Sequence, residues 1–291
     1  MGESSSQFDI YDKDFRKIVV GASQLAEIAS GMEFTEGPVW IEREGRLIFS
    51  DIPADEMKAW SPDGLETFRK PSGHANGNTL DRQGRLITCE HGNRRVSRTE
   101  ADGKVVTLAD SFNGKPLNSP NDVVVKSDGT IWFTDPPYGI KPEQIEQPHN
   151  YVIRLDPDGG LTPVADDFDR PNGLCFSPDE KVLYVADSSA RKHIRLFEVA
   201  GDNTLRGGAV LATIDPGVPD GIRVDMRGRL YSTAGDGIWA IAPEGILLGK
   251  ILLPQTPANC TFGGPDRRTL YITAQHSVYA IELTASGAQR P

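Results

Sequence analysis

The chain has 291 residues, with 31 basic and 41 acidic side chains and a formal net charge of −10. Such an acidic chain is poorly suited to nucleic acid or to an anionic membrane surface, and no apolar run approaches the ~18 residues of a membrane span. Neither partner is therefore expected. The polar, acidic N-terminus lacks the basic start and apolar core of a signal peptide, which predicts a cytoplasmic protein.

Composition and cysteine usage favour one β-rich domain without disulfides. The chain contains 30 Gly and 21 Pro, as expected for an all-β protein with many turns, and its three cysteines are odd in number. Residues 1–15 are predicted as a flexible N-terminal tail. Residues 16–291 are predicted as a single domain, because a repeated pattern covers them without a break in composition.

The repeat is a short hairpin pattern in which a polar residue opens an apolar run, a turn follows, and a second apolar run ends the unit. Its clearest copy is SPNDVVVKSDGTIWFTDPPY at 119–138. β-Branched and aromatic runs on either side of an Asp-Gly turn are a strong hairpin signal. In chain order, the six copies open at Glu36, Asn78, Asn121, Asn172, Asp220 and Asn259.

Six copies at intervals of about 45 residues match the ~40–50 residues of a propeller blade. The sequence therefore predicts an all-β fold, a six-bladed β-propeller with four-stranded blades. Only one clear strand, at 277–283, follows the last hairpin, which leaves the sixth blade one strand short. A strand from 17–28 is predicted to complete that blade and close the ring.

Propeller geometry places the start of each innermost strand at one mouth of the central channel. The six opening residues, two carboxylates and four carboxamides, are expected to converge there as a ring of hard oxygen donors. Such a ring suits one divalent cation, calcium first, with zinc, manganese and magnesium as alternatives. Asn and Asp also favour turns on their own account. Glu36 is not a turn former, however, and two acids would repel one another without a cation.

Other polar side chains are predicted on the same face. His74 and Asn76 lie just before the second repeat, and His91 and Tyr138 lie in loops that follow second strands. Together with Asn121, these are candidate contacts for a small-molecule substrate. The long loop that contains Tyr138 could cover part of the mouth.

The motifs EGPVW, SPND, PNGL, PDGI and NCTFGG resemble those of the gluconolactonase, senescence marker protein and luciferin-regenerating-enzyme family of six-bladed propellers. The resemblance runs from about 33 to 283, and the segments HANGNTLD and CEHGNRR are most similar to its bacterial gluconolactonase branch. It implies that Glu36, Asn172 and Asp220 bind a divalent ion. It also implies that Asn121 is a further ligand or a substrate contact, and that Asp220 is the general base.

Three functions are compatible with this pattern. The first is metal-dependent hydrolysis of a sugar lactone to the open-chain acid, in which the metal polarises the carbonyl and Asp220 takes a proton from water. The second is organophosphate or aryl-ester cleavage on the same ring, since a fold does not fix a reaction. The third is a non-catalytic propeller that binds a ligand or partner around a structural cation. A monomer or a homodimer is expected in each case.

Overall fold

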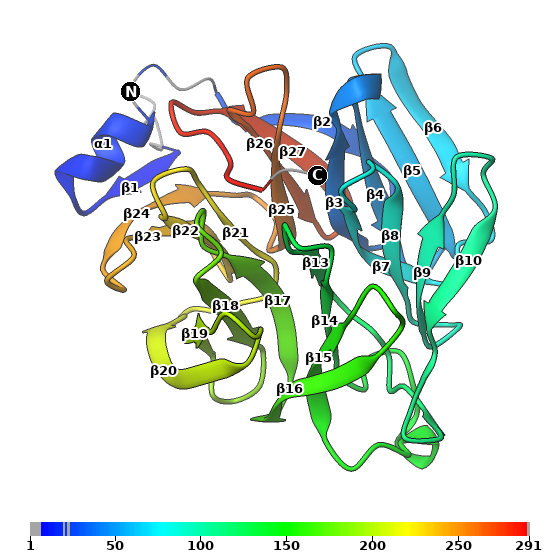
Figure 1. The fold of residues 1–291 in the computed structure, drawn as a ribbon. Helices are drawn as coiled ribbons and strands as arrows, with labels where there is room; N and C mark the ends of the chain where they lie inside the picture. The colour runs from blue at the N-terminus through cyan, green and yellow to red at the C-terminus, as the bar shows by residue number, and fades with distance from the viewer. Residues whose placement is uncertain (1–6, 20, 22–23, 290–291) are drawn as a thin grey trace.

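Six antiparallel sheets surround a central channel in the computed structural model, which describes residues 7–19, 21 and 24–289. Figure 1 shows the sheets arranged around this axis, with one strand of each sheet innermost. Each innermost strand contacts the innermost strands of the two neighbouring sheets, so the ring is closed. The predicted six-bladed β-propeller is confirmed.

Blades one to three follow the chain, each with its innermost strand first. They consist of β3 (Thr35–Ile41), β4 (Arg46–Asp51), β5 (Glu56–Ser61) and β6 (Gly64–Arg69); β7 (Ala75–Leu80), β8 (Leu86–Glu90), β9 (Arg95–Thr99) and β10 (Val105–Ala109); and β13 (Val123–Val125), β14 (Ile131–Asp135), β15 (Asn150–Leu155) and β16 (Leu161–Phe168). Smaller elements in this half are the ribbon β11 (Ser111–Phe112) and β12 (Lys115–Pro116), and the 3-10 turns η1 (Glu42–Glu44) and η2 (Pro142–Gln144).

Blades four to six continue in the same order. They consist of β17 (Pro171–Phe176), β18 (Val182–Asp187), β19 (His193–Val199) and β20 (Leu205–Thr213); β21 (Ile222–Val224), β22 (Leu230–Ala234), β23 (Gly237–Ile241) and β24 (Leu247–Leu252); and β25 (Pro257–Gly263), β26 (Thr269–Ala274) and β27 (Ser277–Glu282). The fourth strand of blade six is β2 (Ala26–Ser30), which pairs antiparallel with β27. The prediction that an N-terminal strand closes the ring is confirmed, but the strand overlaps the predicted 17–28 only at 26–28 and extends to Ser30, while 17–19 belong to a helix.

The expected flexible tail over 1–15 is wrong for residues 7–15, and residues 1–6 lie outside the described residues. β1 (Phe8–Ile10) pairs with β24 and adds a fifth strand to blade five. The helix α1 (Lys13–Val19) follows it. Blade five is thus larger than the four strands that were predicted.

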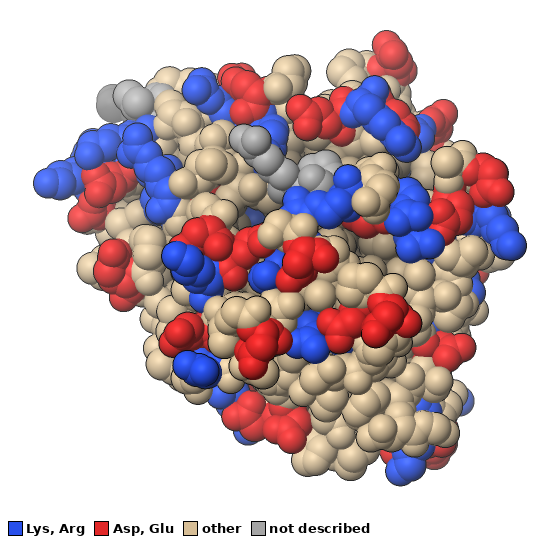
Figure 2. Space-filling model, in the orientation of Figure 1, with Lys and Arg blue, Asp and Glu red and all other residues tan. Residues whose placement is uncertain are grey.

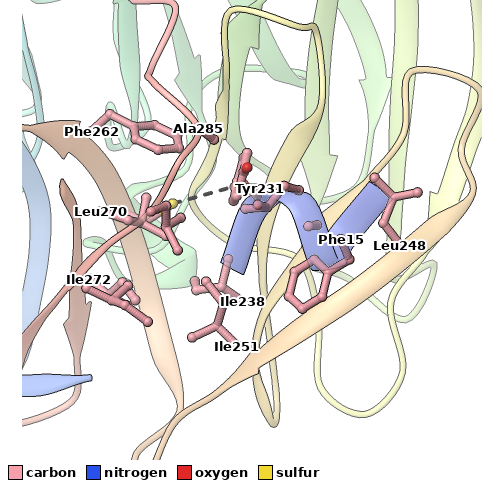
Figure 3. Close-up of a cluster of buried hydrophobic side chains, with 14 of the residues drawn as sticks. Phe15, Tyr231, Ile238, Leu248, Ile251, Phe262, Leu270, Ile272 and Ala285 are labelled. Atoms are coloured by element: carbon pink, nitrogen blue, oxygen red, sulfur yellow. Dashed lines mark hydrogen bonds between the residues drawn. The ribbon is translucent and has the colours of Figure 1, made fainter. Parts of the chain in front are cut away.

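The side chains of α1 explain why this segment is folded. Phe15 and Ile18 are completely buried. Figure 3 shows Phe15 among blade-five side chains, including Ile238 and Ile251 of the same hydrophobic cluster. A helix of seven residues is too short to give a readable helical period, so the sequence carried little signal for it.

Aspartates set the turns that join the first and second strands. In blade three, Oδ1 of Asp128 accepts a hydrogen bond from the Thr130 N–H at 3.0 Å, and Gly129 has φ of 87°. Glycine adopts this left-handed conformation without steric cost. In blade five, Oδ1 of Asp225 accepts the N–H of Arg227 at 2.8 Å in the same way.

The C-terminal segment crosses the end of the channel opposite the repeat-opening residues. The Ala288 N–H donates to the Val224 carbonyl at 3.0 Å, and Nε2 of Gln289 donates to Oγ1 of Thr79 at 2.7 Å. These bonds tie the segment to blades two and five, so it covers this mouth.

Charged side chains are mixed in sign on the face seen in Figure 1. Figure 2 shows acidic and basic groups interspersed there, with neither sign forming a continuous patch. No helix among the described residues is long and apolar enough to cross a membrane.

Candidate metal centre and active site

Five blades present a polar side chain at one equivalent position, at the mouth where the innermost strands begin. In blades one, two and four, the residue before this position pairs with the last residue of the second strand, as in Thr35 with Asp51. In blades three and five, the N–H of the residue itself bonds the last residue but one of that strand, Thr134 or Thr233. The five polar residues are Glu36, Asn76, Asn121, Asn172 and Asp220. Four of them were expected in this ring.

Two residues of the expected ring lie elsewhere. In blade two Ala75 pairs with Glu90, the last residue of β8, so that Asn76 takes the equivalent position. Asn78 instead bonds the backbone carbonyl of Asn76 at 2.8 Å. In blade six the equivalent residue is Ala258, and Asn259 is one residue further along. The same one-residue shift occurs in blades one and four, so the pairing is equivalent in these blades and the sequence alignment places Asn78 two residues, and Asn259 one residue, too far along.

Glycines after the opening residues let neighbouring blades approach closely. The Gly77 N–H donates to the Asn121 carbonyl at 2.8 Å, and the Gly173 N–H donates to the Asp220 carbonyl at 3.2 Å. A Cβ on Gly77 or Gly173 would lie only 2.5 Å or 2.2 Å from those same oxygens. The ring is therefore drawn in until its side chains touch, which a larger residue would prevent.

One half of the ring is a chain of hydrogen-bonded amides. Nδ2 of Asn76 donates to Oδ1 of Asn121 at 2.8 Å, and Nδ2 of Asn121 donates to Oδ1 of Asn172 at 2.6 Å. Nδ2 of Asn172 donates to Oγ of Ser188 at 2.9 Å, and that hydroxyl donates to the Pro219 carbonyl at 2.6 Å. This chain fixes which way each amide points, so that its oxygens are held in place.

The other half of the ring is acidic. Oε2 of Glu36 accepts the Gly37 N–H at 2.6 Å and Nδ2 of Asn259 at 3.0 Å. The same Asn259 nitrogen lies 3.5 Å from Oδ2 of Asp122, which is also 3.4 Å from Nη1 of Arg223. Glu36, Asp122 and Arg223 are all less than 5% exposed. A buried ionic network thus lies directly behind the mouth.

Burial and mutual repulsion disfavour the charged forms of these acids. Burial, followed by the charge of Asp122, raises the pKa of Glu36 to about 7. Burial, followed by the charges of Glu36 and Asp122, raises the pKa of Asp220 well above its usual value. Oδ1 of Asp220 is buried and has no hydrogen-bond partner among the described residues. Such an atom is rare unless something else occupies its vicinity.

The rim residues lie at different depths. His91 is buried, and burial lowers its pKa to about 4, so it is neutral near pH 7. Its Nε2 lies 3.2 Å from Nδ2 of Asn76. His74 is exposed, and its Nδ1 lies 2.8 Å from the Ile52 carbonyl of blade one.

Tyr138 stands beside the acidic part of the mouth. Burial and then the charge of Asp220 raise the pKa of Tyr138 to about 12, while hydrogen bonds with Ser188 and Asn172 oppose the rise. The guanidinium of Arg170 lies over the Tyr138 ring, 5.6 Å from its centroid. The structure therefore places Tyr138 next to the ring, with its hydroxyl close to the ring residues Asn172 and Asp220 and to Ser188.

Three residues of the site were not singled out from the sequence, namely Asp122, Ser188 and Arg223. Asp122 directly follows Asn121, and Arg223 stands between two buried aliphatic residues of β21. A charged residue within a three-residue apolar strand is a signal that could have identified Arg223. Ser188 lies in an ordinary loop sequence and carries no such signal.

No group of three or more His, Cys, Asp or Glu residues in the described part of the chain is arranged to hold a metal ion. The mouth contains the carboxylates of Glu36 and Asp220 among amides. A cation at this position would consequently have to take amide oxygens as ligands as well.

Comparisons with a family model, with protein sequences and with solved structures all match this chain to the same family. A family model described as the SMP-30/gluconolactonase/LRE-like region matches residues 34–276. A gluconolactonase from Zymomonas mobilis subsp. mobilis is 35% identical over 91% of this chain and 83% of that protein. A regucalcin from Xenopus laevis is 30% identical over 82% of each. A solved gluconolactonase structure from Xanthomonas campestris has a TM-score of 0.89 and 38% identity, and covers 95% of both chains. The chain therefore belongs to the SMP-30/gluconolactonase/LRE-like family.

Proposed function

We propose that this protein hydrolyses a sugar lactone of the gluconolactone type to the open-chain acid, and that it needs one divalent cation, calcium first, to do so. The reaction class is supported by relatives at 35% and 38% identity that are gluconolactonases. The observation that carries the proposal is the Asp220 carboxylate, whose buried Oδ1 has no hydrogen-bond partner in the described residues. It stands next to the amide of Asn172 and within the field of Glu36.

The residues at the mouth fit a hard divalent cation. Glu36, Asn172 and Asp220 would hold it, with Asn121 as a fourth ligand or directly beside it. An amide oxygen has two lone pairs, so Oδ1 of Asn172 can accept the bond from Asn121 and still bind a cation. A cation also relieves the repulsion that raises the pKa values of Glu36 and Asp220.

A bound divalent cation would supply polarisation of the lactone carbonyl and charge stabilisation at its oxygen. The protein supplies the base. Asp220 is partly exposed at the mouth, where a carboxylate oxygen can accept the proton of a water that adds to the carbonyl carbon. The ring C–O bond then breaks, and the proton passes from Asp220 to the departing alkoxide. The product is the hydroxy acid.

The remaining rim groups suit a polyol substrate. Asn76, Asn121, His91 and Tyr138 offer amide, imidazole and phenol groups that can bond sugar hydroxyls, and His74 lies further out. A neutral His91 can accept or donate a hydrogen bond without repelling a cation. We propose these as the substrate contacts.

Tyr138→Phe tests this assignment. Loss of one hydrogen bond to substrate is expected to raise KM about threefold to tenfold with little change in kcat. The matched control is Tyr151→Phe, which removes a hydroxyl from the same blade but from a residue that packs against His149 and Phe112. An unchanged KM for Tyr138→Phe would remove it from the substrate site.

The reaction itself is best tested on metal-stripped protein. Proton release is measured on a panel of aldonolactones, an aryl ester and a phosphotriester, before and after calcium, zinc, manganese or magnesium is restored. Restoration of lactone opening by a divalent ion supports the proposal. Turnover of the ester or phosphotriester alone would assign another hydrolytic function, and full activity in the stripped protein would refute metal dependence.

Glu36→Gln tests the metal site directly. The change keeps the shape and one oxygen but removes a charge, so the Kd for calcium is expected to rise at least about tenfold. Isothermal titration calorimetry of metal-stripped protein measures the Kd for calcium. Glu90→Gln is the control, because Glu90 is a completely buried carboxylate that pairs with Arg95 at 2.7 Å and also bonds Ser97, neither of which belongs to the ring. Equal calcium affinity in Glu36→Gln and wild type would refute the assignment.

A further inference from the structure

The channel contains a positive charge of the chain's own, directly behind the proposed metal ligands. Arg223 lies in the middle of β21 and is 3% exposed. Its Nη1 donates to the Ile222 carbonyl at 2.7 Å and lies 3.4 Å from Oδ2 of Asp122. Its Nε has no hydrogen-bond partner among the described residues. Burial of an incompletely hydrogen-bonded guanidinium lowers the stability of the folded protein, which suggests that its charge has a function.

Arg223 is connected to one proposed ligand through two intermediates. Asp122, from blade three, lies between Arg223 and Asn259, and Nδ2 of Asn259 donates to Oε2 of Glu36 at 3.0 Å. This series of contacts therefore begins in blade five, passes through Asp122 of blade three and Asn259 of blade six, and ends at Glu36 of blade one. Arg223 lines the cavity beside Gln289, at the end of the channel that the C-terminal segment crosses. It could therefore influence a cation at the mouth only by its charge and through Asp122.

The charges at the centre add up in a simple way. Glu36, Asp122 and Asp220 carry −3 when ionised, and Arg223 reduces the formal total to −2. A monovalent ion would leave this buried centre negative, and a trivalent ion would make it positive. A divalent ion neutralises it, which is the arrangement that burial favours.

We propose that Arg223 is a positioning residue that sets the charge of this centre and thereby matches it to a divalent cation. The inference rests on the proposed metal site and goes beyond it, because it assigns the choice of ion charge to a residue that does not bind the ion. The charge of Arg223 is permanent at all accessible pH values. It therefore needs no change of protonation to act.

The test compares two ions of similar size and different charge, calcium and terbium. Their Kd values are measured by titration of metal-stripped protein, with terbium luminescence as the signal and calcium as competitor. Arg223→Met removes a positive charge and is expected to raise the ratio of the calcium Kd to the terbium Kd about tenfold or more. Asp122→Asn removes a negative charge and is expected to lower the same ratio by a similar factor.

Opposite shifts in the two variants separate a charge effect from structural damage, since damage would move both in one direction. Arg223→Lys keeps the charge and should keep the wild-type ratio. Arg229→Met is the matched control, because Arg229 is also buried in blade five but pairs with Asp225 at 2.6 Å. It should lower stability and leave the ratio unchanged.

The outcomes distinguish this inference from the metal site on which it rests. Wild type that binds calcium, with ratios in Arg223→Met and Asp122→Asn within twofold of it, would overturn the role of Arg223 alone. Wild type that binds neither ion would overturn both the role and the site. If Arg223→Met does not fold, the direction of the shift in Asp122→Asn decides the question.

Discussion

Asp220→Asn is expected to lower kcat for lactone opening by about 10²–10⁴ at saturating metal. The amide keeps the size of the carboxylate and one oxygen, but it cannot accept a proton from water. The substitution should not lower the stability of the folded protein, because burial and neighbouring acids disfavour the charged carboxylate that the amide replaces. In metal-free protein, Asp220→Asn is therefore expected to raise the unfolding temperature while it removes activity.

Asp225→Asn is the control for this experiment. Asp225 lies in the same blade, five positions along the chain from Asp220 and away from the mouth. It is completely buried and pairs with Arg229. The Asp225→Asn variant should be less stable than wild type and should have the same kcat. A kcat for Asp220→Asn within about threefold of wild type, at saturating ion, would show that the reaction does not use Asp220 as its base.

Removal of residues 1–30 is expected to abolish cooperative folding. The deletion takes away β2, the outer strand of blade six, and α1 with the completely buried Phe15 and Ile18. Loss of large buried side chains costs about 2–5 kcal/mol each, against a total stability of about 5–15 kcal/mol for a typical domain. Urea unfolding followed by near-ultraviolet circular dichroism measures the result.

Removal of residues 1–12 gives the comparison, because it takes away β1 and retains α1 and β2. This shorter deletion should lower the urea midpoint and preserve a single cooperative transition. The ring-closure argument would fail if the protein without residues 1–30 unfolded at the same urea concentration as the full chain.

The blade architecture could be predicted from the sequence because each hairpin carries its own local signal. Runs such as Val123–Val125 and Ile131–Asp135, on either side of an Asp-Gly turn, specify their pairing almost alone. The missing strand of blade six could be predicted by counting the strands that follow the last hairpin. β1 and α1 were not found, because Phe15 and Ile18 acquire their role only when blade five is present to pack against.

The site was predictable to the extent that repeat phase sets position. Glu36, Asn121, Asn172 and Asp220 follow the phase, and the structure brings them to one mouth. Asn78 does not, because the match to Asn172-Gly173 is Asn76-Gly77, and the prediction used the second asparagine of this segment in its place.

The ionic network behind the ring was harder to predict. The contact of Arg223 with Asp122 joins residues of blades five and three, which are not neighbours in the ring, and depends on how closely the innermost strands approach one another. Neither residue's sequence neighbourhood reveals that distance.

The pairing of β2 with β27 has a consequence for the synthesis of the protein. The first of these strands leaves the ribosome long before the second, and at roughly 5–20 residues per second the interval is about 10–50 s. During that time β2 has no partner in its own blade, and β1 also waits for β24. The nascent chain can form its middle blades as they emerge, but β2 finds its partner only when β27 has emerged. Closure of the ring thus waits for blade six, and the growing chain presents open strand edges until then.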